Sequence, residues 1–266
     1  MKDWKQTSTR KAFAIHLVLS LLIFSTLVFT MLVFWFPGKL FYLDGGWQGL
    51  KIVALIDIVL GPAMTLFLFK PGKKSLVFDM SVIASIQIAA LVFGFYTTYQ
   101  QRTVAIVFSH EGFSTVSATA HKEANEQLLQ KSKEPSLVSE FDAGRPALLS
   151  TPLPNADNFG KFMADLLNGL PEPHERSDRY SLLKDHSEEV AKRSHNAEAL
   201  DVLPHAEAIY AALEKHDRSL NDTEVVPFKT RYASGELLFD PLNVKIIDYI
   251  PKPKAAATST AELGDN

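Results

Sequence analysis

Three long apolar runs dominate the first hundred residues of the chain. They cover residues 12–36, about 50–69 and about 76–99, and only scattered polar positions interrupt them. A helix of 25 residues is about 37 Å long, enough to cross a hydrocarbon core of about 30 Å with some tilt. The first run is too long for the apolar part of a signal peptide, and no A-x-A-like cleavage site follows it. The pattern therefore predicts three retained transmembrane helices.

Shorter alternating patterns follow from residue 100 onward. Apolar, β-branched or alternating segments predict strands at 103–108, 112–117, 146–153, 225–232, 236–239 and 244–250. The first two strands are expected to pair as a hairpin, and so are the last two. Helical periodicity predicts helices at 118–130, 155–167 and 204–215, and the charged stretch 181–199 is also assigned as helical. The apolar side chains of 155–167 fall on one face, typical of a helix that packs on a core.

These patterns predict a membrane protein with three transmembrane α-helices followed by a C-terminal α+β soluble domain. We divide the chain into an N-terminal segment (1–11), a three-helix membrane region (12–99), an α+β domain (100–254) and a disordered tail (255–266). The tail is rich in Ala, Thr and Ser and has little apolar surface to bury.

Charge is distributed unevenly between the two halves. Residues 1–100 hold nine Lys/Arg, four Asp and no Glu, a net charge of +5, so the rest of the chain carries −8. Seven Lys/Arg lie in the N-terminal segment and the loop 70–75, against three near the opposite ends of the runs. Because basic residues favour the cytoplasmic side, we expect the N-terminus inside the cytoplasm and the α+β domain outside it.

Composition and spacing exclude several functional classes. The chain has no Cys, so it has no disulfide framework, no thiolate zinc site and no Cys nucleophile. The acidic second half lacks the basic footprint of a nucleic-acid binder. The eight His residues show no metal-binding spacing, and no nucleophile elbow, Walker or Rossmann pattern occurs. We therefore predict no catalytic residue, no metal and no cofactor, and we expect that the protein is not an enzyme.

Polar residues inside the apolar runs suggest contacts between the helices. By a rise of 1.5 Å per residue, His16 and Asp79 lie about 5 Å deep, and Asp57 and Gln87 lie about 17 Å deep. Because an isolated carboxylate in lipid is costly, we expect His16–Asp79 and Asp57–Gln87 to face each other as pairs. These pairs form a proton relay or ion site, or they hold the bundle together or select a partner helix. The pattern favours the second interpretation, since a relay needs more acids in series.

Two glycine-containing segments are candidate contact sites. Gly61 and Pro62 interrupt the second run, where the proline removes an amide donor; the bend opens a notch for another helix or is satisfied within the bundle. The segment 44–49 contains three glycines in five positions, suited to tight turns, and Trp47 suits a membrane interface. This segment is either a turn between two spans or a contact site, and it lacks the ending of a phosphate-binding loop.

Together, these segments resemble the type IV pilin accessory proteins (TfpX/TfpZ-like). The resemblance is close over residues 12–118 and is looser beyond them. It rests first on a basic N-terminus followed by an apolar span. It also rests on the loop motif at residues 41–49, the second-span motif at 57–62, and residues 96–108, which cover the end of the third span and the strand that follows. The residues that carry it, as candidates for partner binding or structure, are Asp44, Gly45, Gly46, Trp47, Gln48, Asp57, Gly61, Pro62, Gln87, Gln101 and Arg102.

The resemblance implies a bacterial inner-membrane protein with a periplasmic domain. It would assist the assembly, stability or dynamics of a cognate type IV pilin, and so serve pilus assembly and twitching motility. The implied partners are the pilin, proteins of the pilus assembly platform and membrane lipid, with no nucleic acid. Two alternatives stay open: a membrane sensor or scaffold component with a non-pilin periplasmic partner, and a membrane enzyme or small transporter that uses Asp57 and Asp79.

Overall fold

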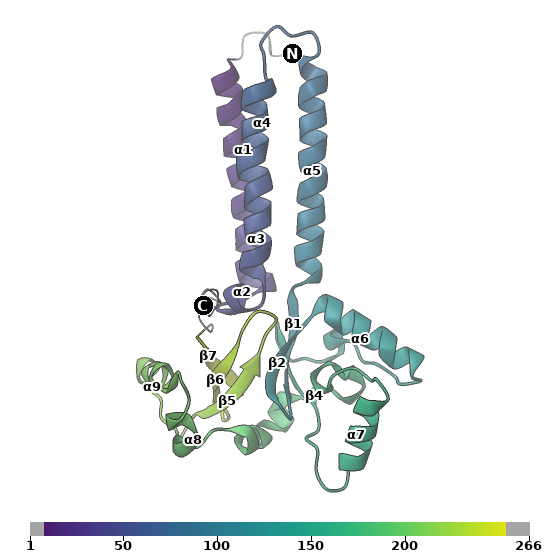
Figure 1. The fold of residues 1–266 in the computed structure, drawn as a ribbon, viewed down its shortest axis with the longest axis vertical. Coiled ribbons are helices and arrows are strands. Elements are labelled where there is room, and N and C mark those ends of the chain that lie inside the picture. The colour runs from purple at the N-terminus through teal and green to yellow at the C-terminus, as the bar shows by residue number, and fades with distance from the viewer. Residues whose placement is uncertain (1–7, 254–266) are drawn as a thin grey trace, which may run out of the picture.

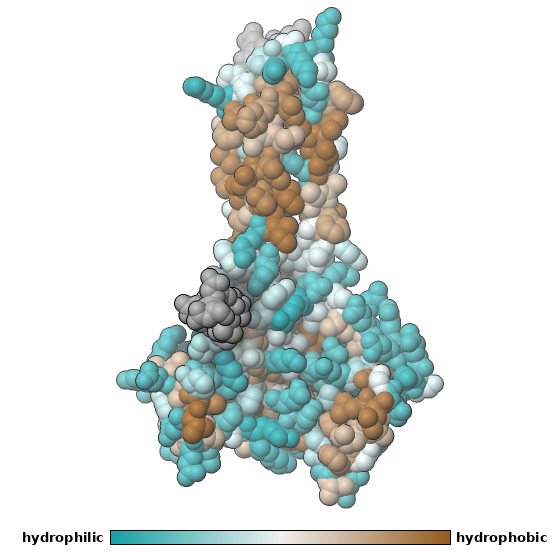
Figure 2. Space-filling view, viewed as in Figure 1, coloured by the Kyte–Doolittle hydropathy of each residue, from teal (hydrophilic) through white to brown (hydrophobic). Residues whose placement is uncertain are grey.

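The chain forms a bundle of long helices with a mixed sheet at one end of it (Figure 1). The computed structural model describes residues 8–253. Over this range, three helices are long and apolar enough to cross a membrane. Figure 2 shows the apolar side chains as a band around these helices, whereas the junction with the sheet domain is largely hydrophilic. The predicted fold class, three apolar helices followed by an α+β part, is confirmed.

The three apolar helices include two π-helical segments. The first joins α1 (Thr9–Thr30) to the π-helical η2 (Met31–Trp35). The second consists of α3 (Gly46–Ala54), the π-helical η3 (Leu55–Leu60) and α4 (Gly61–Leu68), and the third is α5 (Leu76–Gln100). Segment η3 lies directly before Pro62, which has no amide proton to donate. The wider π-helical turn therefore occurs where the regular α-helical hydrogen bonding is broken, a common setting for functional residues.

The central helix of the bundle contacts both of the others. Helix α1 packs along α4, and α5 packs on α3 and α4. The first and third helices meet at the end nearest the sheet, where the Trp35 ring lies 4.8 Å from Phe95 and 5.4 Å from Tyr99. Edge-to-face aromatic contacts of this kind add to the stability that apolar burial provides. The first and third helices are thus in direct contact at the end nearest the sheet.

A seven-stranded mixed sheet forms the centre of the second half. Its strands are β1 (Thr103–Ser109), β2 (Gly112–Ser117), β3 (Ala147–Ser150), β4 (Ser181–Leu182), β5 (Glu224–Lys229), β6 (Ser234–Asp240) and β7 (Lys245–Pro251). Their order is β4-β3-β1-β2-β5-β6-β7. The β1–β3 and β2–β5 pairs are parallel and the others are antiparallel. The predicted hairpins β1–β2 and β6–β7 are confirmed.

Alternate side chains of the strands pack into layers on the two faces of the sheet. On one face, α6 (Ala118–Gln130) packs near one end, and α8 (Ala197–Asp201) and α9 (Ala206–Lys215) pack near the other. The opposite face is covered by the 3-10 segments η7 (Leu183–Asp185) and η8 (Ser187–Arg193). That second core also takes in Leu40 and Leu43 of α2 (Leu40–Leu43), a short helix from the loop between the first two spans.

Helix α7 (Phe159–Leu167) lies at the margin of the sheet domain, and it has no buried residue. Three further 3-10 segments, η4 (Val138–Glu140), η5 (Pro173–Glu175) and η6 (Ser177–Arg179), connect these elements. The helix predicted at 155–167 is therefore shorter than expected, and its apolar side chains do not enter the core. The prediction of a helix over 181–199 is wrong: the chain there forms β4, 3-10 turns and the start of α8. Leu183 and Val190 lie in 3-10 turns and pack into the core on one face of the sheet.

The division of the chain into four segments stays a prediction. The proposed disordered tail, 255–266, lies outside the described residues, as does most of the N-terminal segment.

Candidate functional site at the junction of helices and sheet

The loop between the first two spans turns sharply at two adjacent glycines. Gly45 has φ of +107°, a left-handed conformation that ends α2 and begins α3. A Cβ on Gly45 would lie 2.8 Å from the Tyr232 ring, and a Cβ on Gly46 would lie 2.6 Å from the Phe41 ring. Both positions therefore require glycine. Gly45 needs it for its backbone conformation and for the lack of space for a side chain, and Gly46 needs it only for the lack of space. The turn holds Asp44 in a fixed position beside the sheet.

The Asp44 carboxylate is the centre of the junction between the loop and the sheet. It is 1% exposed and accepts a hydrogen bond from Thr115 Oγ1 at 2.9 Å and from the backbone N of Arg231 at 3.0 Å. The Thr103 hydroxyl also donates to it. These donors come from β1, β2 and the turn after β5, so one side chain of the loop joins three parts of the sheet. Three donors satisfy a buried carboxylate that would otherwise be strongly destabilising.

Main-chain contacts of the turn after β5 strengthen this junction. The carbonyl of Leu43 accepts hydrogen bonds from Thr230 Oγ1 at 2.6 Å and from the backbone N of Tyr232 at 3.2 Å. Arg231 Nη2 donates to the carbonyl of Gln101 at 3.3 Å, at the end of α5. The turn at 230–232 is thereby bonded both to the loop after the first span and to the end of the third.

An ion pair forms a second connection at the other end of the sheet. Lys39 Nζ lies 2.6 Å from Asp248 Oδ1 and donates to the carbonyl of Tyr249 at 3.0 Å. Asp248 is 7% exposed and also accepts from His216 Nε2 at 3.1 Å. Burial acts to raise the pKa of Asp248, but the hydrogen bonds from Lys39 and His216 outweigh it, so the pKa lies below its ordinary value. The loop is therefore attached to both β2 and β7.

The remaining loop candidates lie on the bundle side of the junction. Trp47 is 42% exposed, and Lys51 Nζ lies 5.6 Å from its ring centre. The Arg102 guanidinium lies 3.7 Å from the Tyr99 ring and donates to the Tyr99 carbonyl at 2.8 Å. Gln48 Oε1 is buried without a hydrogen-bond partner in the described part of the chain. Aromatic rings with cations above them are typical of a membrane interface.

A polar cluster lies inside the bundle, along the contact of α1 with the central span. Ser20 Oγ donates to Asp57 Oδ1 at 3.3 Å, and His16 Nδ1 lies 2.6 Å from Thr65 Oγ1. The Thr65 hydroxyl also donates to the Gly61 carbonyl at 3.2 Å. Asp57 is 6% exposed, and its Oδ2 atom is buried without a partner among residues 8–253. The cluster links two helices through side chains that lipid cannot solvate.

The predicted pair of His16 with Asp79 does not form, and no hydrogen bond joins Asp57 to Gln87 among the described residues. His16 contacts Thr65 because α1 packs on α4, whereas Asp79 pairs with Lys73 and lies 3.4 Å from Ser75 Oγ at the start of α5. Asp57 bonds to Ser20, and Gln87 Nε2 has no partner over the described range. Counting residues gives the depth of a side chain but not the helix that it faces, which is why the partners differ.

Gln87 instead packs against the glycine at the end of the π-helical segment. A Cβ on Gly61 would lie 1.7 Å from Gln87 Nε2 and 2.6 Å from its Cδ. Gly61 therefore lets α5 approach the central span closely. Pro62 follows it and is buried. The interruption at Gly61 and Pro62 is thus occupied by a side chain of the same protein, which agrees with the alternative of a bend satisfied within the bundle.

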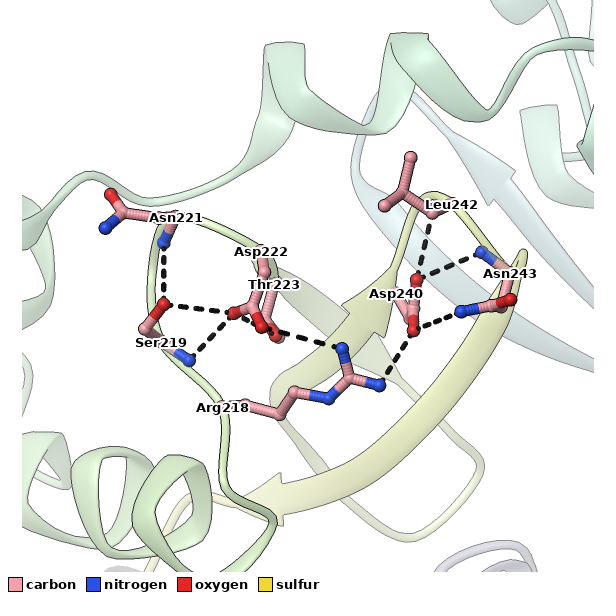
Figure 3. Close-up of polar contacts among 8 residues, drawn as sticks. All are labelled: Arg218, Ser219, Asn221, Asp222, Thr223, Asp240, Leu242 and Asn243. Atoms are coloured by element: carbon pink, nitrogen blue, oxygen red, sulfur yellow. Dashed lines mark hydrogen bonds and ion pairs between the residues drawn. The ribbon is translucent and has the colours of Figure 1, made fainter.

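Polar clusters in the sheet domain serve the fold. Asp240, the last residue of β6, accepts hydrogen bonds from Asn243 Nδ2 at 2.9 Å and from the backbone N of Asn243 and Leu242 at 3.0 and 3.1 Å (Figure 3). Arg218 Nη2 donates to it at 2.9 Å and Nη1 lies 3.6 Å from Asp222. The hydrogen bond from the Asn243 side chain is the largest of the effects that lower the pKa of Asp240. With this many partners, the carboxylate stabilises a turn.

Arginine 176 has a comparable role at the margin of the domain. It is 3% exposed and donates to Asp178 at 2.8 and 2.7 Å and to Asp165 at 3.0 Å. Arg179 also contacts Asp165, which belongs to α7. Helix α7, which buries no side chain, is therefore fastened to the domain by ion pairs.

The charged residue buried deepest in the sheet is Glu236, which is 1% exposed and contacts His205. His195 Nε2 and Lys252 Nζ lie 3.9 and 3.6 Å from its other oxygen. Among the described residues, no group of three or more His, Cys, Asp or Glu has the geometry of a metal site.

The contacts that the sequence did not reveal are the partners of the loop. Asp44 was a candidate, but Thr103, Thr115 and Arg231 were not, nor was the Lys39–Asp248 pair. One signal was present: Asp248 is a charged residue at a position inside an apolar strand pattern.

Fold and site together define a helical membrane region joined to a mixed-sheet domain by buried hydrogen bonds. No family model matches the chain, and no solved structure matches it. The chain is 31% identical over 109 residues to the fimbrial assembly protein of serogroups C1 and C2 of Dichelobacter nodosus, a match that covers 40% of this chain and 83% of that protein. It is 31% and 30% identical over 109 residues to the serogroup I and E1 proteins of the same organism, covering 42% of each. The chain belongs to this family of fimbrial assembly proteins.

Proposed function

We propose that this protein is an inner-membrane accessory of type IV pilus assembly that assists the assembly, stability or dynamics of a cognate pilin. Its resemblance to the type IV pilin accessory proteins and its membership of a fimbrial assembly family support this role. The role is that of a binding protein and needs no catalytic group. The pilin is the proposed partner, in the membrane and in the periplasm, with the assembly platform as a second partner class.

The single observation that carries the proposal is the junction centred on Asp44. A membrane region that merely anchored the domain would need only a linker between the two. Here a loop between two spans enters the sheet, with Leu40 and Leu43 in its core and the Asp44 carboxylate among its strands. Such a joint transmits the position of the helices to the sheet domain. This favours a protein that holds one partner at two levels, in the membrane and outside it.

The proposed orientation places the sheet domain in the periplasm. Seven Lys/Arg near the N-terminus and in the loop 70–75, against three at the sheet end, support it. At the sheet end, Trp35 packs on Tyr99 and Trp47 packs on Tyr42, and aromatic rings at this level suit a membrane interface. A protease added to right-side-out spheroplasts should therefore cut the sheet domain and spare the loop 70–75.

Cross-linking in living cells tests the proposed partner. The full-length protein, tagged and cross-linked before solubilisation, should recover the cognate pilin, and a tagged three-span membrane protein of unrelated sequence should not. Recovery of a different periplasmic protein without pilin would favour the alternative, a membrane sensor or scaffold component. Equal pilin recovery by both baits would contradict the proposal.

A further inference from the structure

A polar hollow of about 150 Å³ opens in the sheet domain next to the bundle. Strands β2 and β5 pair only at Phe113–Phe228 and Ser114–Lys229, and they diverge beyond these residues. The hollow lies at this divergence, and Asp44 of the membrane loop forms part of its wall. Its lining includes Asp44, Ser114, Ser117, Ala120, Lys229 and Arg231.

The chemistry of this lining suits a small anion. Ala120 is the only apolar residue among those that line it, so most of its side chains carry a polar or charged group. Lys229 and Arg231 bring two positive charges. The Asp44 carboxylate opposes them, but it already accepts three hydrogen bonds from Thr103, Thr115 and Arg231. Two cationic residues therefore face one carboxylate in the lining, which leaves a net positive charge.

Two further donors point to an oxyanion in particular. Ser114 is 3% exposed and lines the hollow, and its hydroxyl has no hydrogen-bond partner in the part of the chain that the structure describes. Helix α6 begins beside the hollow, with Ser117 as its N-cap and Ala120 in its first turn. The positive end of a 13-residue helix favours an anion there. A hydroxyl, an ammonium and a helix end, approaching from different elements, match the several oxygens of a phosphate.

The position of the hollow indicates where such a phosphate comes from. Asp44 follows the first span closely, and Arg231 is bonded to Gln101 at the end of the third. The hollow therefore faces the level at which the head groups of phospholipids lie. Glu175 interacts with Lys229 but does not line the hollow.

We propose that this hollow binds a phosphate group, with Lys229 and Ser114 as its principal ligands. A phospholipid head group and free inorganic phosphate share this chemistry. Lipid binding at this position would fix the sheet domain at a defined height above the membrane.

Thermal unfolding of the full-length protein in a neutral detergent tests the proposal, because a ligand of the folded state raises the midpoint. One arm adds inorganic phosphate at constant ionic strength, with chloride as the reference. The other adds phosphatidylglycerol, with the phosphate-free lipid monoglucosyl diacylglycerol as the reference. Each arm uses the wild type, Lys229→Gln, Ser114→Ala/Lys229→Gln, and Lys184→Gln as a matched control, since Lys184 is an exposed lysine of the same domain outside the hollow.

We expect phosphate or phosphatidylglycerol to raise the midpoint of the wild type and of Lys184→Gln. The affinity of Lys229→Gln should fall about tenfold, or about 1.4 kcal/mol, because the variant loses a hydrogen bond from a charged group. A shift with the lipid alone assigns the site to a head group, and a shift with free phosphate assigns it to a soluble anion as well. No shift with either ligand, or equal shifts in the wild type and in Lys229→Gln, would overturn the proposal.

Discussion

The carboxylate of Asp44, in the loop between two apolar helices, accepts a hydrogen bond from the Thr115 hydroxyl of strand β2 at 2.9 Å. The two residues are 71 positions apart in the chain. This contact, with those from Thr103 and Arg231, bonds the sheet domain to the loop between the helices.

Replacing Asp44 should weaken the contact between the loop and the sheet. In Asp44→Ala, two threonine hydroxyls and one backbone N–H lose their acceptor, so we expect a loss of about 3 kcal/mol in the free energy of unfolding. Chemical denaturation in detergent would measure it. Asp157→Ala is the control, because that residue is exposed and should change stability by less than about 0.5 kcal/mol. Equal stability of the two variants would show that the junction does not depend on this carboxylate.

Glycines 45 and 46 should not tolerate alanine. The added Cβ would approach Tyr232 at the first position and Phe41 at the second, and Gly45 also has a left-handed conformation. We expect each change to cost about 1–3 kcal/mol. Gly160→Ala is the matched control: it lies in α7 with open space around it, so the change should be neutral or stabilise by up to about 1 kcal/mol. The midpoint of thermal unfolding distinguishes these outcomes, and similar midpoints for all three would contradict the geometry of the turn.

The contact between Gly61 and Gln87 should behave as a coupled pair. Gly61→Ala places a methyl group where Gln87 lies, so we expect it to loosen α5 from the central span and lower the unfolding midpoint. Gln87→Ala removes the obstacle, and the double variant should be more stable than Gly61→Ala alone.

A double-mutant cycle measured by unfolding in detergent gives the coupling, which we expect to be about 1–2 kcal/mol. If the two effects simply add, the helices do not meet at this point.

Acid should open the contact between Lys39 and Asp248. The pKa of Asp248 is lowered in the folded protein, because the hydrogen bonds from Lys39 and His216 outweigh the effect of burial. A lowered pKa contributes stability above the ordinary value of 3.8, and this stability is lost as the pH falls through the folded value.

The wild type should thus lose more stability below about pH 4 than Asp248→Asn does, in denaturation measured from pH 6 to pH 2. Asp157→Asn, at an exposed position, should follow the wild type. An identical pH dependence in Asp248→Asn would mean that the ion pair does not stabilise the fold.

Much of the fold could be predicted because its signals are local. The three spans follow from hydropathy, and the β1–β2 and β6–β7 hairpins follow from strand patterns with short turns between them. Residues 181–199 could not be predicted in the same way. Their charged composition suits a helix. The segment instead forms 3-10 turns, because tertiary packing places Leu183 and Val190 in the core.

Only some residues of the candidate site could be predicted from the sequence. Asp44 and its glycines stood out because glycine-rich turns beside a carboxylate are unusual. Their partners did not, because Thr115 and Arg231 are ordinary residues whose importance arises from contacts distant in the chain. The same limit applies to His16, whose depth was predictable and whose partner on α4 was not.

Counting surface pili in the bacterium that encodes this protein tests the central claim most directly. A strain that lacks the gene should carry fewer type IV pili, and a copy of the wild type or of Asp157→Ala should restore them. Asp44→Ala, in which the contact between the sheet domain and the helices is weakened, should restore them poorly when it is present at the wild-type level. Unchanged pili in the deletion strain would contradict the account.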